Sequence, residues 1–136
     1  MTPEKKITLN GQEVSMIYCT ATENGYERLA EKSINVFFPT FGKDEEGNDI
    51  ITEPATAKTE DFIVLAIAAI VAYYSRAKKD VPLDSDYILY EATPQERTDL
   101  LTAIIELRTE WYTVPKVVEK TIRKESEGKD GDPKNA

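Results

Sequence analysis

The strongest constraint on the fold is the segment Phe62–Tyr74, which runs for thirteen residues without a charge. Thr59, Glu60 and Asp61 precede it and suit a helix start, because threonine caps free amides and carboxylates favour the positive end of the helix dipole. Thirteen residues are too few for a membrane span, which needs about 20. A helix that is apolar on every side is buried by its neighbours. We therefore expect a central helix over Thr59–Lys78.

The N-terminal segment shows the alternation of a strand pair. Apolar residues recur at every second position on both sides of the dipeptide Asn10-Gly11. This pattern predicts a β-hairpin with strands at Lys6–Asn10 and Glu13–Tyr18, because both residues of the dipeptide tolerate the positive φ of a type I′ turn. A lone hairpin is unstable in water, so its apolar face must rest on helices.

Two further helices are marked by capping boxes, in which a threonine hydroxyl and a glutamate three residues later bind free backbone amides. The first box, Thr20–Glu23, predicts a short helix that ends near Glu31–Ser33. The second box, Thr93–Glu96, has proline at the first helical position and predicts a long amphipathic helix that Val114-Pro115 closes. The segment Ile34–Phe38, which precedes a proline, fits either a strand or the last turns of a helix.

The other segments carry weaker patterns. Gly42–Ala55 is rich in acidic residues, has two glycines and no periodicity, and we expect a mobile loop there. Residues 116–136 contain eleven charged residues in twenty-one, which predicts a largely disordered tail. The chain therefore divides into one globular domain at residues 1–115 and a tail at 116–136. We expect an α+β, mainly α fold with the β-hairpin packed on about four helices.

Composition narrows the chemistry. The chain has no histidine and one cysteine, Cys19, so histidine-based triads, histidine metal sites and internal disulfides are absent. We expect no enzyme, no cofactor and no metal site, and we expect Cys19 to be a small buried residue. The formal charge of −8 disfavours nucleic acid and anionic membranes as partners. The single cysteine and the lack of an apolar signal segment favour a cytoplasmic location.

Six aromatic residues fall on three predicted helices. A short helix that starts at Leu83–Asp86 has Tyr87, Ile88 and Tyr90 as its buried candidates. Aromatic residues at helical spacing usually belong to a core, but tyrosine and tryptophan also suit half-apolar interfaces. The candidate partner-binding residues are Tyr73, Tyr74, Tyr87, Tyr90, Trp111 and Tyr112.

The order of these segments resembles the small phage and prophage tail assembly chaperones of the Bacteroides type. The likeness covers about residues 5–115 and rests on five segments: Lys5–Val14, Tyr18–Glu27, Ala72–Tyr74, Ala92–Glu96 and Leu107–Pro115. The resemblance implies a non-enzymatic protein-binding role in bacteriophage virion assembly. Such chaperones coat the hydrophobic, helical tape-measure protein before the tail tube polymerises around it. A homo-oligomer is compatible with that role.

An acidic protein-binding inhibitor or DNA-mimic adaptor is the alternative hypothesis. It would use carboxylates as phosphate surrogates, and its partner binding would be lost by about 0.5 M salt because such salt screens exposed charges. Its candidate residues are Asp44, Glu45, Glu46, Asp49, Glu53, Glu60 and Asp61.

Overall fold

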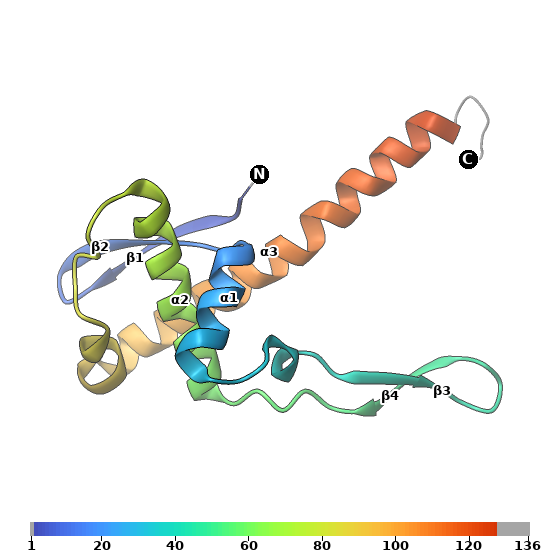
Figure 1. Ribbon diagram of the computed structural model, residues 1–136, viewed down its shortest axis with the longest axis horizontal. Coiled ribbons are helices and arrows are strands. Elements are labelled where there is room, and N and C mark those ends of the chain that lie inside the picture. Colours follow the sequence, from blue (N-terminus) through green and yellow to red (C-terminus); the bar gives the residue numbers. More distant parts are fainter. Residues whose placement is uncertain (1, 128–136) are drawn as a thin grey trace.

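The computed structural model describes residues 2–127, with side chains as far as Thr113. The elements are β1 (Glu4–Leu9), β2 (Gln12–Ile17), α1 (Thr20–Ala30), η1 (Ile34–Phe37), β3 (Thr40–Lys43), β4 (Asp49–Glu53), α2 (Thr59–Ala77), η2 (Tyr87–Glu91) and α3 (Pro94–Glu127) (Figure 1). An N-terminal β-hairpin packs on a mainly helical body. The expected α+β, mainly α fold is confirmed.

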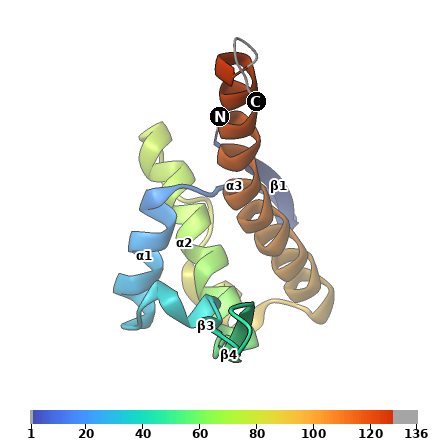
Figure 2. The same cartoon turned by 90° about the vertical axis from the view of Figure 1, so that its right-hand side faces the viewer.

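Helix α2 is the centre of the fold and lies between α1 and α3 (Figure 2). Ten of its nineteen residues are buried, among them Leu65, Ala66 and Ala69. The expected central helix is therefore confirmed. Its N-cap is Lys58 rather than Thr59, and the Lys58 N–H donates to Asp61 Oδ2 at 2.8 Å.

The hairpin β1–β2 covers α2 and α3 and is confirmed, starting two residues earlier than expected. Asn10 and Gly11 both have positive φ, 52° and 75°, as the predicted turn requires. The side chains of Leu9, Val14 and Met16 are fully buried in the core. The apolar alternation thus places one face of the hairpin on the helices.

Helix α1 starts at the expected place by a different cap. Cys19 is the N-cap, and its N–H donates to Thr22 Oγ1 at 3.1 Å. The Thr22 hydroxyl donates in turn to the Ile17 carbonyl at 2.8 Å, which anchors the helix to the end of β2. The expected box at Thr20–Glu23 is wrong, because Thr22 fills the position that Glu23 was expected to fill.

The segment Ile34–Phe38, for which the pattern allowed a strand or the last turns of a helix, instead forms the separate 3-10 turn η1 over Ile34–Phe37. Ser33 caps this turn by accepting the Asn35 N–H at 3.1 Å. Phe37 is buried at its end and packs edge-to-face against Tyr26 and Phe62, with ring centroids 4.9 Å apart in each pair. This contact joins the turn to α1 and α2. Burial of Phe37 therefore decides a conformation that local pattern left open.

The acidic segment after η1 is a second hairpin, β3–β4, and the expected mobile loop is wrong. Asp44 Oδ1 accepts the N–H groups of Glu46 and Asn48 at 2.9 and 2.8 Å, and Gly47 adopts a φ of 85°. A carboxylate that binds amides inside its own turn forms a β-turn without hydrophobic alternation. We call residues 40–53 the arm.

Helix α3 begins with the predicted capping box. The Thr93 N–H donates to Glu96 Oε1 at 2.9 Å, and the Glu96 N–H donates to Thr93 Oγ1 at 3.1 Å. The expected end at Val114-Pro115 is wrong, because the helical backbone continues to Glu127. A proline removes one backbone donor, and a helix can continue around that gap.

Helix α3 therefore includes residues 116–127, which were expected to belong to a largely disordered tail. The rest of that tail, residues 128–136, lies outside the described residues. Within the part of the chain that the structure describes, no helix has both the length and the apolarity of a membrane span.

Candidate protein-binding groove

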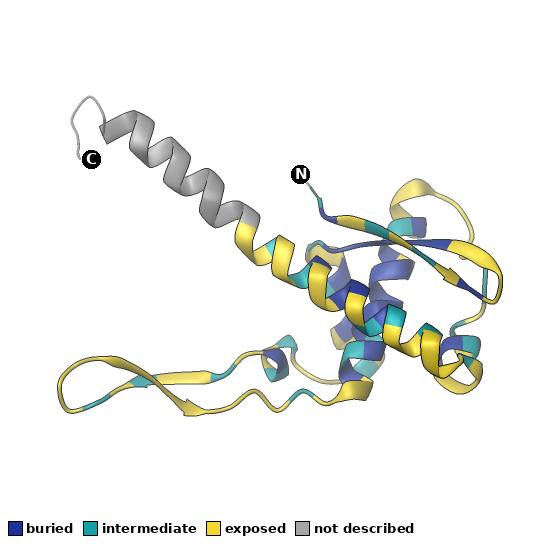
Figure 3. Cartoon of the chain, turned by 180° about the vertical axis from the view of Figure 1, so that it is seen from behind, coloured by how far each residue is buried: buried dark blue, intermediate teal, exposed yellow. Residues whose placement is uncertain are grey.

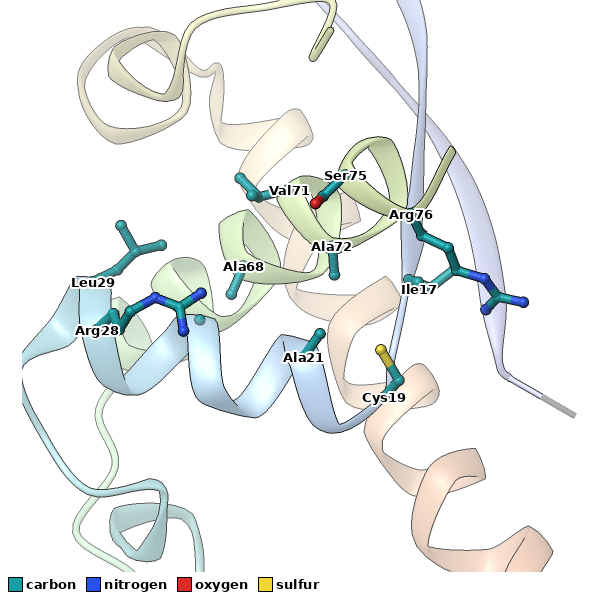
Figure 4. Close-up of a pocket in the computed structure, with 11 residues that line it drawn as sticks. Ile17, Cys19, Ala21, Arg28, Leu29, Ala68, Val71, Ala72, Ser75 and Arg76 are labelled. Carbon is teal, nitrogen blue, oxygen red and sulfur yellow. The ribbon is translucent and has the colours of Figure 1, made fainter. Parts of the chain in front are cut away.

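A groove of about 530 Å³ lies between α1 and α2 (Figure 4). Small residues of both helices line it: Ala21 and Gly25 on α1, and Ala68 and Ala72 on α2. A Cβ atom on Gly25 would lie 3.4 Å from the Cβ of Ala68, which is an ordinary contact distance. The lining residues are Ile17, Cys19, Ala21, Gly25, Arg28, Leu29, Ala68, Val71, Ala72, Ser75 and Arg76.

Each of the two helices contributes one exposed apolar side chain to the edge of the groove. Leu29 on α1 keeps 55% of its surface accessible, and Val71 on α2 keeps 42%. Both side chains lie beside Ala21, Ala68 and Ala72 in Figure 4, and we call these three residues the alanine floor. Exposed large apolar residues that flank a concave apolar surface are typical of binding sites.

Two arginines give the groove a positive charge. Arg28 reaches over the groove from α1 and Arg76 lies at the end next to Ile17 (Figure 4). Neither arginine forms an ion pair with an acidic side chain among the described residues. In a chain of net charge −8, these cations are available to an acidic ligand.

Cys19 also lines the groove, at the N-terminal end of α1. It is half-buried, so the expectation of a buried cysteine is wrong. The physical reason is its position as N-cap, where the side chain projects beside the helix start rather than into the core. Among the described residues, no three acidic or cysteine side chains converge as a metal site would require.

The six aromatic candidates do not form one surface. Tyr73 and Tyr74 form an edge-to-face pair on α2, and the buried Tyr74 hydroxyl accepts the Ser15 N–H at 3.1 Å. Tyr87 donates its hydroxyl proton to Glu96 Oε1 at 2.7 Å. Tyr90, expected to be buried, is 81% exposed, because it lies on the outer side of the π-helical turn η2. It is the most accessible of the six.

Trp111 and Tyr112, both on α3, belong to a separate aromatic cluster around Tyr18. Both pack against Tyr18, with ring centroids 6.2 and 6.5 Å apart. The hydroxyls of Tyr18 and Tyr112 donate to the same carboxylate oxygen of Glu23. Burial, and then the bond to Glu23, raise the pKa of both tyrosines well above the usual value. They therefore stay protonated and join α1 to α3.

Arg108 ties the 3-10 turn to this cluster. Its guanidinium lies 4.8 Å from the Phe38 ring centroid and 5.3 Å from that of Tyr112, and it donates to the Phe37 carbonyl at 3.1 Å. These contacts make Tyr112 a packing residue that joins α3 to the end of η1.

The acidic residues of the alternative hypothesis are also divided. Five lie on the arm, Glu60 is exposed at the start of α2, and Asp61 is buried. Asp61 Oδ1 accepts the Tyr26 hydroxyl at 2.9 Å and Lys32 Nζ at 3.1 Å. Burial alone would raise the pKa of Asp61, but the bonds from Lys58, Lys32 and Tyr26 together lower it. Asp61 is therefore a structural anion and not a phosphate surrogate.

No family model, curated protein or solved structure matches this chain. The groove was missed in the sequence because α2 is apolar on every side, so no face is distinguished. The available signal was the spacing of Ala68, Ala72 and Arg76, which places two small residues and a cation on one face of the helix. Gly25 is the matching small residue on α1.

Proposed function

We propose that this protein is a non-enzymatic holding chaperone that binds an amphipathic helix of a client protein in the α1–α2 groove. The observation that carries the proposal is an exposed apolar groove whose two helices each contribute an arginine without an ion-pair partner among the described residues (Figure 4). An apolar stripe on a client helix would contact the alanine floor, Leu29 and Val71. Arg28 and Arg76 would pair with acidic residues beside that stripe.

The proposed client is the tape-measure protein of a phage or prophage tail, bound before the tail tube forms. The resemblance of residues 5–115 to tail assembly chaperones supports this client class. A tape-measure protein is long, helical and hydrophobic, which suits a binding site that recognises one apolar face of a helix. The acidic surface of this chain would keep the complex dispersed through charge repulsion.

The test is co-expression with a tape-measure protein and co-purification in low salt and in about 0.5 M salt, where exposed charge pairs are screened. We expect the complex to persist in high salt, because burial of apolar surface supplies most of the binding. Val71→Asp places a charge in the groove and is expected to abolish co-purification. Ile105→Asp is the matched control, because Ile105 is a β-branched helix residue with 48% exposure on α3.

Binding that survives Val71→Asp would contradict the groove as the client site. Binding that survives this variant and is also lost in high salt would favour the alternative, an acidic inhibitor or DNA mimic. That outcome would direct attention to the carboxylates of the arm.

A further inference from the structure

We propose that the arm of one copy docks in the α1–α2 groove of a second copy, so that the protein associates with itself head to tail. This inference uses the groove of the proposed function but needs no client. The arm supplies the apolar and acidic surface, and the groove supplies the apolar and basic surface. The exposure of the arm, its charge and the direction in which it projects favour this contact.

Within the part of the chain that the structure describes, no other element covers the apolar side chains of the arm. Phe41 is 64% exposed and Ile51 is 59% exposed, and Figure 3 shows exposed residues along almost the whole arm. The two residues are cross-strand neighbours in the register, so they form one apolar pair on the same face. Two strands alone are marginally stable in water, and an exposed apolar hairpin is a surface for association.

The charge of the arm selects the groove as its binding site. Residues 40–53 contain one lysine and five acidic residues, which leaves a net charge of −4. Two arms placed together would repel each other, whereas the groove presents Arg28 and Arg76 beside an apolar floor. The groove of a second copy therefore offers the arm both an apolar surface and the opposite charge.

The direction of the arm makes this contact intermolecular. Figures 1 and 3 show the arm projecting away from the helical body rather than folding over α1 and α2. Because the arm and the groove are different surfaces, the interface is heterologous, and two copies joined by one such contact keep one free arm and one free groove. Such an interface forms rings when the rotation closes and filaments when it does not.

A client helix and a neighbouring arm would compete for the same groove. Self-association would then cover the apolar groove while no client is present, and client binding would release the arm. The size of the assembly is therefore expected to fall when a client is added.

The first experiment is sedimentation velocity of the full chain at concentrations up to about 100 μM, which covers weak specific association. We expect association that becomes at least tenfold weaker in Arg28→Glu/Arg76→Glu and in Glu45→Lys/Glu46→Lys. Mixing these two charge-reversed variants should restore association, because the unchanged acidic arm of the first variant meets the unchanged basic groove of the second, and the lysine arm of the second meets the glutamate groove of the first. A wild-type chain that stays monomeric overturns the proposal, and so does a mixture that fails to associate.

The second experiment uses Cys19, the single cysteine of the chain, as a reporter inside the groove. Ile51→Cys places a thiol on the arm, and diamide oxidation is expected to give a ladder of disulfide-linked multimers with Cys19 joined to the new cysteine. Thr102→Cys on the exposed face of α3 is the control for random collision. Equal cross-linking of both variants, or joining of two arm cysteines, overturns the proposal.

The outcomes separate the two proposals. If Glu45→Lys/Glu46→Lys weakens self-association and retains the tape-measure protein, both proposals hold. Self-association without client binding would leave the arm contact standing and overturn the chaperone function. Client binding by a strictly monomeric chain would do the reverse.

Discussion

The two β-hairpins of this protein have the same topology and opposite surroundings. In β1–β2, the side chains of Leu9, Val14 and Met16 are fully buried against the helices. In β3–β4, the large apolar side chains of Phe41, Ile50 and Ile51 are exposed. The first hairpin therefore contributes to the core, while the second contributes surface. The difference shows that a hairpin held by its own turn can be retained for contacts outside its chain.

The turns of the two hairpins differ in the same way. The Asn10 N–H of the first turn donates to Glu96 Oε2 on α3 at 2.7 Å, so this turn is fastened to the body. In the second turn, Asp44 binds amide groups of its own turn. Disruption of the first turn should therefore destabilise the whole fold, whereas disruption of the second turn should destabilise only the arm.

The largest expected effect comes from Leu9→Ala in β1. It removes a fully buried side chain and leaves a cavity, which should lower the free energy of unfolding by about 3 kcal/mol. Urea denaturation followed by circular dichroism measures the change. A loss below about 1 kcal/mol, the range of an exposed site, would contradict the assignment of this hairpin to the core.

A smaller effect is expected from Glu96→Gln at the first turn. Hydrogen bonds from the Asn10 N–H, then from Thr93 and Tyr87, lower the pKa of Glu96 from 4.5 to about 2. A lowered pKa stabilises the fold above pH 4.5, and this stabilisation is lost as pH falls toward 2. At pH 7 the variant should lose about 1 kcal/mol, because these charge-assisted bonds lie near solvent.

The measurement is urea denaturation of both proteins from pH 7 to pH 2. The stability gap between wild type and Glu96→Gln should narrow below pH 4.5. Asp44→Asn serves as the comparison, since its bonds stay within the arm and its removal should leave unfolding of the body unchanged. A constant gap across the pH range would contradict the role of the Glu96 charge.

The smallest effect on stability is expected from Phe41→Ala. Although phenylalanine is larger than leucine, this ring is already exposed, so the free energy of unfolding should change by less than about 0.5 kcal/mol. Self-association should weaken in the same variant. Destabilisation as large as that of Leu9→Ala would remove the contrast between the two hairpins.

Much of the body could be predicted from short-range patterns. The alternation around Asn10-Gly11, the apolar run Phe62–Tyr74 and the box at Thr93–Glu96 each specify a local hydrogen-bonding scheme that the structure retains. The arm was missed because its turn depends on the Asp44 carboxylate and not on apolar alternation. The end of α3 was misplaced because a proline weakens a helix without always ending it.

The candidate groove could not be predicted from the sequence, and the six aromatic residues were grouped too simply. Helical spacing indicates which residues share a face, but it does not say which neighbour covers that face. Tyr74 is part of the core and contacts Ser15, and the partly buried Trp111 packs against the core through Tyr18; both are contacts between distant segments. The groove exists because α1 crosses α2 at Gly25, a contact between two helices.

By itself, the sequence determined the hairpin β1–β2, the start of each long helix, the central place of α2 and the excess of negative charge. These properties follow from periodicity, capping and composition, which act over a few residues. Only the tertiary structure decided that Asp61 is buried, that Phe41 is exposed and that Arg28 and Arg76 line one groove. Burial and convergence depend on how segments distant in the chain pack, and neither is encoded within any one segment.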